Sequence, residues 1–347
     1  MKTIKSMMLL FVIGLIAAGT TVVAEEKTKE YNEAWPVDAV TSLEIDNRFG
    51  EVKINNQGGD EVTIDVIITV EAPNENKADD LLDLIEVNFS KSGGTVKAVT
   101  EIENNFKSQK RFSIDYKVNI PSDKNLKISN KYGNTVVGKL TGNGEFICKY
   151  GNFTAYELST PETGSLNLVL AYGNANIGAA SFMNLDVSYS PIDIEEANKL
   201  KIESKYSSIN VEECNAVKIE SKYDKFKFEE LQSLTARTKY TNIKIEELAK
   251  SLKIESGYGS IKVDEVDPGF EFIDITNSYG QIQLGLDDSD YSLDASCDYC
   301  GISYPSDEFT GNRIKENHTS TIVGTVGSGM GGKVTVKSRY GDIKLDD

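Results

Sequence analysis

Adjacent pairs of carboxylates are the residues of this chain best placed to do chemistry, because they recur at a fixed interval. Five pairs form the set: Glu195 and Glu196, Glu212 and Glu213, Glu229 and Glu230, Glu246 and Glu247, and Asp264 and Glu265. Carboxylates stacked at strand spacing repel one another, and their oxygens suit Ca²⁺, so a bound cation would stabilise such a row. Lysines of the same repeats offer screening instead: Lys201, Lys218 and Lys253, and Lys205, Lys222 and Lys239. We expect a solvated, partly screened edge without a cofactor, and keep a Ca²⁺ site as the alternative.

Catalytic arrangements find little support in the sequence. Polysaccharide hydrolases built on parallel β-helices need a general acid and a general base beside the glycosidic bond. Residues 313–315 spell RIK and residues 287–288 spell DD, as in that group, but its Asn-Thr-Asp and His-Gly elements are missing. His318 is the only histidine, which excludes a multi-histidine metal site. We expect a protein that is not an enzyme and has no catalytic residues, with a polysaccharide-active enzyme as the alternative.

The four cysteines divide into two kinds. Cys148 and Cys214 fall at apolar repeat positions three coils apart, too distant for a disulfide, and are predicted to be buried. Cys297 and Cys300 form a CDYC segment that could close a small disulfide loop. A redox-active site is not favoured, because no thioredoxin-like strand and helix surround this segment.

These groups are carried by a repeat of about 17 residues, marked in each unit by one aromatic residue. The twelve positions are Phe49, Tyr132, Tyr150, Tyr172, Tyr189, Tyr206, Tyr223, Tyr240, Tyr258, Tyr279, Tyr299 and Tyr340. Counted from the aromatic residue, positions −6, −4, −2, +3, +5 and +8 are apolar or small, which is the strand period. One such unit cannot bury its own apolar face, so the units must stack as a solenoid.

The repeat also predicts where its aromatic residues lie. We expect the rings to stack on those of neighbouring coils and to line the corner of the core; an exposed row used for recognition is the alternative. Glycine follows the aromatic residue in several units, for example at Gly133 and Gly151, which suggests a corner with positive φ. A core filled by side chains leaves no room for a ligand. Function is therefore expected on the outside or at the ends of the rod.

The predicted fold class is all-β: a right-handed, single-stranded parallel β-helix, or β-solenoid, with coils of about 17–20 residues. Residues 25–120 are expected to form an N-terminal cap and first coil, with an antiparallel insertion, one short α-helix and Trp35 as a cap residue. Residues 121–347 form the repeats, interrupted by an irregular excursion at about 304–333. The glycine-rich segment at 327–332 reads as a hairpin tip, and the final unit is expected to close the rod.

The first 24 residues have the layout of a cleavable secretory signal. Lys2 and Lys5 precede an apolar run, and small residues end at Ala24. We expect export to the periplasm, the outer-membrane surface or the extracellular space, with no transmembrane segment after cleavage. A formal net charge of −17 argues against nucleic acid as a partner.

Three segments and the recurrent YGN, YGS and YGD corners carry a resemblance to a known group. The segments are LEIDNRFGEVKI at 43–54, KADDLLDLIEV at 77–87 and VNIPSDKNLKISNKYGNTVV at 118–137. Their order resembles the bacterial putative-adhesin families, including the head GIN-domain type, over most of residues 40–347. This resemblance implies a secreted or envelope β-solenoid and supplies no catalytic residues.

The combined expectation is a secreted, non-enzymatic adhesin or cell-envelope interaction protein, with a cell-surface glycan or an envelope protein as partner. A Ca²⁺-responsive structural envelope protein is a further alternative. The sequence leaves the oligomeric state open.

Overall fold

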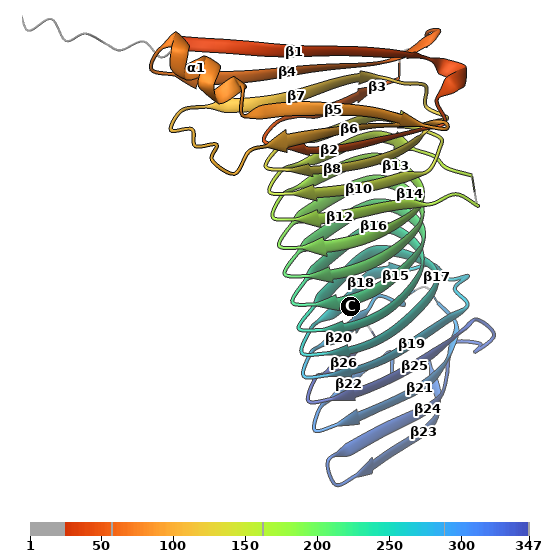
Figure 1. Cartoon of the computed structure of the whole chain (residues 1–347). Helices are drawn as coiled ribbons and strands as arrows, with labels where there is room; N and C mark the ends of the chain where they lie inside the picture. Colours follow the sequence, from red (N-terminus) through yellow and green to blue (C-terminus); the bar gives the residue numbers. More distant parts are fainter. Residues whose placement is uncertain (1–24, 57, 162, 288, 346–347) are drawn as a thin grey trace, which may run out of the picture.

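The computed structural model describes residues 25–56, 58–161, 163–287 and 289–345. It is a rod of stacked coils with antiparallel strands and one short helix at its N-terminal end (Figure 1). The predicted all-β solenoid is confirmed. The signal sequence predicted at 1–24 lies outside the described residues. No helix in the described ranges is long and apolar enough to cross a bilayer.

The coil body runs from residue 125 to residue 284. Its strands are β8 (Asn125–Lys131), β9 (Thr135–Leu140), β10 (Gly144–Lys149), β11 (Phe153–Leu158), β12 (Leu166–Ala171), β13 (Ala175–Ser188), β14 (Pro191–Lys205), β15 (Ser208–Lys222), β16 (Lys225–Lys239), β17 (Asn242–Gly257), β18 (Ile261–Val266), β19 (Phe272–Ser278) and β20 (Ile282–Leu284). Successive coils pair in parallel and in matching register, so that Ile192 lies opposite Ile209 and Ile209 opposite Phe226. Residues one repeat apart therefore form columns along the rod.

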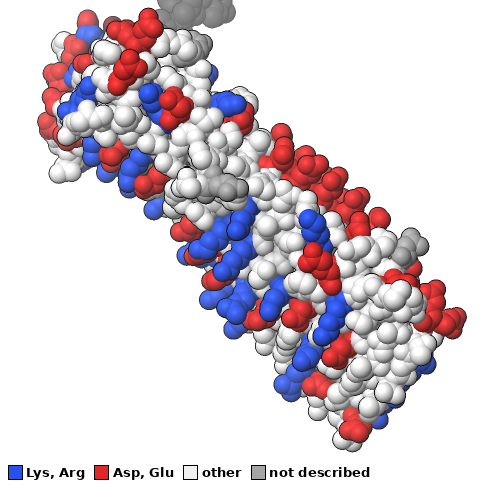
Figure 2. Space-filling view, turned by 90° about the vertical axis from the view of Figure 1, so that its right-hand side faces the viewer, with Lys and Arg blue, Asp and Glu red and all other residues white. Residues whose placement is uncertain are grey.

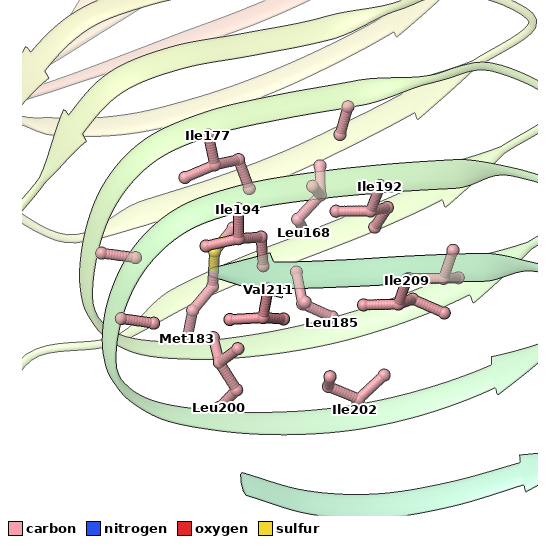
Figure 3. Close-up of a cluster of buried hydrophobic side chains, with 14 of the residues drawn as sticks. Leu168, Ile177, Met183, Leu185, Ile192, Ile194, Leu200, Ile202, Ile209 and Val211 are labelled. Carbon is pink, nitrogen blue, oxygen red and sulfur yellow. The ribbon is translucent and has the colours of Figure 1, made fainter. Parts of the chain in front are cut away.

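The core is built from the columns that the two-residue period predicted to face inward. Leu200, Ile202, Ile209 and Val211 are at most 2% exposed and meet inside the coil (Figure 3). Each buried aliphatic side chain of this kind stabilises the fold by about 1.5–3 kcal/mol. The filled interior leaves the outer columns as the surface available to a partner.

The strands before the aromatic corner stack as one sheet and the strands after it stack as a second. The N-terminal cap covers the first edge of both sheets. Its elements are β1 (Glu25–Pro36), a 3₁₀ turn (Val37–Ala39), β2 (Ser42–Arg48), β3 (Val52–Asn55), β4 (Glu61–Ala72), α1 (Glu75–Leu82), β5 (Ile85–Ser92), β6 (Thr95–Ile102) and β7 (Phe112–Asn119). The chain β1–β4–β7 is antiparallel and continues in parallel pairing onto β3, while β5 pairs antiparallel with β6, which continues onto β2. This is the predicted antiparallel insertion.

Helix α1 packs against β1 and β4 at the N-terminal end of the rod. The side chain of Asn74 accepts a hydrogen bond from the backbone N–H of Lys77 (2.9 Å) and so caps the first turn. Ala78, Leu81 and Leu82 are buried. Trp35 packs with its ring centroid 6.3 Å from that of Phe89, which places it in the cap.

The C-terminal end differs from the expectation. Its strands are β21 (Tyr291–Asp298), β22 (Ile302–Ser303), β23 (Phe309–Glu316), β24 (Thr319–Val326), β25 (Gly332–Arg339) and β26 (Ile343–Lys344). The final unit does not close the rod, because β25 lies between β19 and β21 and pairs in parallel with both. The excursion is a regular β23–β24 hairpin whose strand β24 pairs antiparallel with β21. This hairpin closes the rod, since it supplies an antiparallel edge to the outermost coil.

Candidate functional site

The twelve aromatic residues form one continuous ladder along the rod. Neighbouring ring centroids are 4.7–5.1 Å apart, and the rings are close to parallel. In space Tyr340 stands between Tyr279 and Tyr299, and the ring of His318 stacks on Tyr299 at the end. His318, exposed in the turn between β23 and β24, thus ends the ladder. The ring faces cover one another, so the ladder presents ring edges and hydroxyls.

The expectation that these rings line the core is wrong. The eleven ladder tyrosines are 42–54% exposed. All twelve ladder residues have positive φ, between 53° and 63°. This left-handed conformation turns the ring outward and gives the inward place to the residue that follows, as with Ser190 and Thr241, which are 1% and 0% exposed.

The corner glycines do not supply the positive φ that the sequence suggested. The aromatic residue before each of them has it instead. A Cβ added at Gly151 would run into the backbone carbonyl of Gly133 in the preceding coil. Glycine therefore allows close stacking of corners. Seven corners share this requirement, at Gly50, Gly133, Gly151, Gly173, Gly259, Gly280 and Gly341.

Four consecutive corners use a polar side chain in place of glycine, and these side chains form a ladder of their own. Each accepts a hydrogen bond from the corner N–H of the coil before it. The bonds run from Gly173 N to Ser190 Oγ (3.2 Å), Ser190 N to Ser207 Oγ (3.3 Å), Ser207 N to Asp224 Oδ1 (2.6 Å) and Asp224 N to Thr241 Oγ1 (3.3 Å). Asp224 is 3% exposed, and burial raises the pKa of its carboxyl, against the opposing effect of hydrogen bonds from Ser204 and Ser207.

The predicted acidic edge is present as a row of carboxylates on adjacent coils. Glu196, Glu213, Glu230, Glu247 and Glu265 lie opposite one another in successive strand pairs. An acidic band of this kind runs along one flank of the rod (Figure 2). The described ranges contain no group of three or more His, Cys, Asp or Glu side chains arranged to hold a metal.

The lysines that screen this edge are not the predicted ones. Lys227 lies 2.8 Å from Glu229 and Lys262 lies 2.6 Å from Asp264. They stand two residues before the carboxylates on the same strand and so share its outer face. The predicted Lys201 instead pairs with Glu203, on the other sheet.

Screening is also incomplete. In the first two of the five acidic repeats, the positions equivalent to Lys227 and Lys262 hold Asp193 and Asn210. Among the described residues, Glu195, Glu196, Glu212 and Glu213 form no ion pair, so this part of the edge keeps its full negative charge.

A shallow groove of about 1010 Å³ runs beside the tyrosine ladder, from the coil of Asp186 to that of Tyr279. It lies on the strands before the tyrosine corner, whereas the acidic edge lies on the strands after it. One wall is the lysine column Lys205, Lys222 and Lys239, which forms no ion pair within the described chain. The other wall is the column of Glu203, Glu220, Arg237 and Glu255. Opposite charges thus face each other at Glu203 and Lys205 and at Glu220 and Lys222, whereas Arg237 and Lys239 carry the same sign.

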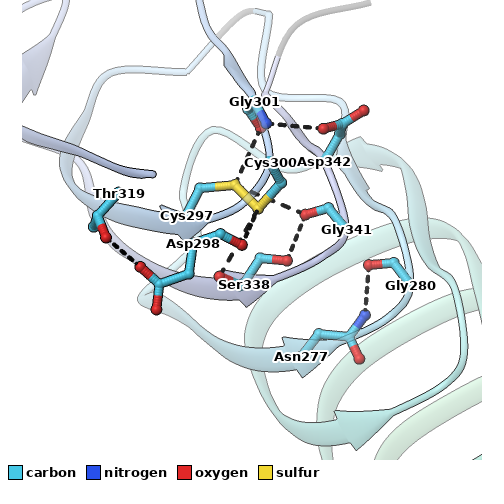
Figure 4. The surroundings of a disulfide bond; sticks show 10 residues. All are labelled: Asn277, Gly280, Cys297, Asp298, Cys300, Gly301, Thr319, Ser338, Gly341 and Asp342. Atoms are coloured by element: carbon cyan, nitrogen blue, oxygen red, sulfur yellow. Dashed lines mark hydrogen bonds between the residues drawn. A yellow bond between two sulfur atoms is a disulfide. The ribbon is translucent and has the colours of Figure 1, made fainter. Parts of the chain in front are cut away.

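The cysteines occupy structural positions. Cys297 and Cys300 form a disulfide across the Tyr299 corner, in the last coil before the closing hairpin (Figure 4). Cys148 and Cys214 are free and buried, and burial raises the pKa of each thiol to about 11. The stable thiol form makes these two cysteines unreactive in the folded protein.

The RIK triplet lies on the closing hairpin. Arg313 lies on hairpin strand β23 and stacks 5.2 Å from the rings of Tyr304 and Phe309. Residue 288 of the DD pair lies outside the described residues.

Tyr156 is an exposed aromatic residue that the repeat analysis overlooked. Its side chain is 69% exposed, more than any ladder tyrosine. It stands at position +6 of its coil, where later repeats carry the first glutamate of each acidic pair. The sequence marks this residue in two ways. An aromatic residue stands at +6 only in this coil, and the same position is glycine in the coils before and after it, at Gly138 and Gly178.

Comparison with known proteins adds fold-level similarity. No protein-family model matches the chain, and no curated protein matches it. Among solved structures, the chain is similar to a "putative cell adhesion protein" from Clostridium sporogenes, with 9% identity, a TM-score of 0.25, and coverage of 92% of this chain and 99% of that one. It is also similar to a "putative adhesin" from Bacteroides fragilis, with 16% identity, a TM-score of 0.40, and coverage of 62% and 97%. A "putative lipid binding protein" from Parabacteroides distasonis has 16% identity, a TM-score of 0.35, and coverage of 74% and 96%. At these values the likenesses carry no argument about function.

Proposed function

We propose that this chain is an exported, non-enzymatic binding rod that holds a cell-surface glycan or an envelope protein along its side. The observation that carries the proposal is the groove of about 1010 Å³ beside the tyrosine ladder. Stacked repeats characteristically present such extended surfaces, because every coil adds the same side chains at the same place. The core is filled, so a partner must bind outside it.

The chemistry of the groove supports a partner with polar or charged groups repeated along its length. Lys205, Lys222 and Lys239 are spaced by one coil each, about 4.8 Å, and are not neutralised within the described chain. Their ammonium groups are available to carboxylates, phosphates or hydroxyls of a partner. The adjacent tyrosine hydroxyls add hydrogen-bonding groups with the same spacing.

The test measures binding of the purified, labelled chain to whole cells, isolated envelopes and a glycan array. The groove variant replaces Lys205, Lys222 and Lys239 with glutamine. The matched control replaces Lys201, Lys218 and Lys253, which carry the same charge on the same sheet outside the groove. We expect the groove variant to bind at least tenfold more weakly and the control to bind as the parent does, since rim charges away from the contact matter little.

Two results count against this proposal. Absence of binding to cells, envelopes and glycans by the parent chain would remove the binding role itself. Equal loss in both lysine variants would show an effect of net charge, and the groove would then not be the binding surface.

A further inference from the structure

Tyr156 differs from the ladder tyrosines because no aromatic ring of the described chain covers it. Within the described chain its side chain stacks on no other ring and forms no hydrogen bond, and it is 69% exposed. The ladder rings cover one another at centroid distances near 4.9 Å. A free face is the electron-rich part of an aromatic ring, which attracts the weakly positive C–H groups of a ligand.

The column positions on either side of Tyr156 are glycines, and polar side chains of more distant coils reach toward them. Its neighbours Ala155 and Glu157 pair with the residues that flank Gly138 in the coil before and Gly178 in the coil after. Asn56 Oδ1 lies 2.6 Å from where a Cβ of Gly138 would stand, and Glu195 Oε2 lies 3.7 Å from where a Cβ of Gly178 would stand. An amide and a carboxylate therefore flank the Tyr156 column, and both can accept hydrogen bonds from the hydroxyls of a ligand.

Three surface cavities share Tyr156 as a wall. Their volumes are about 520, 390 and 470 Å³, within the range of small-molecule sites. The first is also lined by Asn176 and Asn210, and the third by Asn56 and Lys53. The side chain of Asn176 has no hydrogen-bond partner in the described chain. An exposed ring face is thus surrounded by both donors and acceptors.

We propose that Tyr156 is the stacking platform of a glycan subsite that takes a neutral pyranose unit. A pyranose presents a face of C–H groups to the ring and a rim of hydroxyls that both donate and accept, which matches the amides around Tyr156. Carboxylates such as Glu195 line the 390 and 520 Å³ cavities and would suit a basic peptide. The exposed ring and the Asn176 amide, which has no partner in the described chain, favour the sugar. This inference rests on the proposed binding role and names its partner class.

The experiment titrates the full chain with cellotetraose, chitotetraose and maltotetraose, followed by ligand-observed NMR and calorimetry. The variants are Tyr156→Ala, Tyr156→Phe and Tyr156→Trp. Tyr132→Ala is the matched control, because it removes a half-exposed tyrosine whose faces are covered and which lies outside the groove. We expect at least one tetrasaccharide to bind the parent, the Phe and Trp variants and the control. Tyr156→Ala should weaken binding at least tenfold with an unchanged circular dichroism spectrum.

Failure of this inference is distinct from failure of the binding role. If cells or envelopes bind the parent but no tetrasaccharide does, or Tyr156→Ala binds sugar normally, the subsite is wrong and the rod remains a binding protein. Tetralysine is titrated in the same way. If it binds the parent while the sugars do not, and its binding is lost in Tyr156→Ala, a basic partner occupies the site and the glycan assignment is overturned. If the parent binds neither cells, envelopes nor sugars, both proposals fail.

Discussion

At the scale of single residues, the aromatic residue of each repeat sets the shape of the corner. Left-handed backbone is unfavourable for a residue with a Cβ, by about 1–2 kcal/mol. All twelve ladder residues adopt it here. The stacking of their rings offsets the strain, because each interior ring contacts two neighbours, and aromatic pairs contribute about 0.5–1.5 kcal/mol each. The residue type at the corner was visible in the sequence, but its outward direction was not.

The buried carboxyl of Asp224 predicts a pH effect on stability. Its pKa is raised in the folded state, so the folded protein holds this proton to higher pH than the unfolded chain does. The associated stability is fully present below the ordinary pKa of aspartate and is lost as pH rises through the raised value. Asp224→Asn keeps an acceptor for Ser207 N–H and should therefore raise Tm at pH 7 but not at pH 3, as followed by thermal unfolding.

The control for this prediction is Asp186→Asn, which changes an exposed carboxylate of the same rod. Its Tm difference from the parent should not grow between pH 3 and pH 7. A difference for Asp224→Asn that is equally large at both pH values would contradict the role given to burial.

At the scale of elements, the tyrosine ladder is predicted to stabilise the rod. The contributions of its rings and of its backbone conformation to the free energy of unfolding can be measured separately. Tyr206→Ala should destabilise the protein by about 1–3 kcal/mol, because two stacking contacts are lost. Tyr206→Gly should be less destabilising than the alanine variant by about 1 kcal/mol, since glycine adopts positive φ without strain. Urea unfolding measures both. Equal stability of the two variants would mean that the positive φ at 206 carries no strain.

Element prediction from the sequence succeeded where the apolar period was clear. The stacked coils, the antiparallel insertion and its one short helix lie in the ranges expected. Strand β1 was missed, because residues 25–36 are strongly charged and both their faces are largely exposed, so no apolar alternation marks them. The lysines that screen the acidic edge were misassigned, because their pairing depends on which residues share an outer strand face. Tyr156 was missed because a single residue leaves no periodic signal.

At the scale of the whole molecule, the order of the last coils was beyond sequence reasoning. Each unit has similar inward columns, so the repeats fit on one another in any order, and only the connections decide which coil lies where. The chain passes from β20 to the outermost coil, forms the closing hairpin and returns to fill the place between them.

This order predicts unequal effects of two truncations. A chain ending at Gly331 lacks β25 and β26, so β21–β24 lose their contact with the rod and should become sensitive to protease. A shorter chain ending at Leu286 keeps every coil up to β20 in continuous contact and should remain resistant from β1 onwards. Limited proteolysis with mass spectrometry distinguishes them. Resistance of β21–β24 in the chain ending at Gly331 would show that these strands dock without the last unit.

The returning unit also has a consequence for the order of assembly during synthesis. Coils up to β20 can add to the growing rod one after another as the chain leaves the ribosome, because each contacts the coil made just before it. The outermost coil cannot do so, since its neighbour in space, β25, is translated after it. Strands β25 and β26 therefore join the outermost coil to the rod, and this junction forms only after they have been translated.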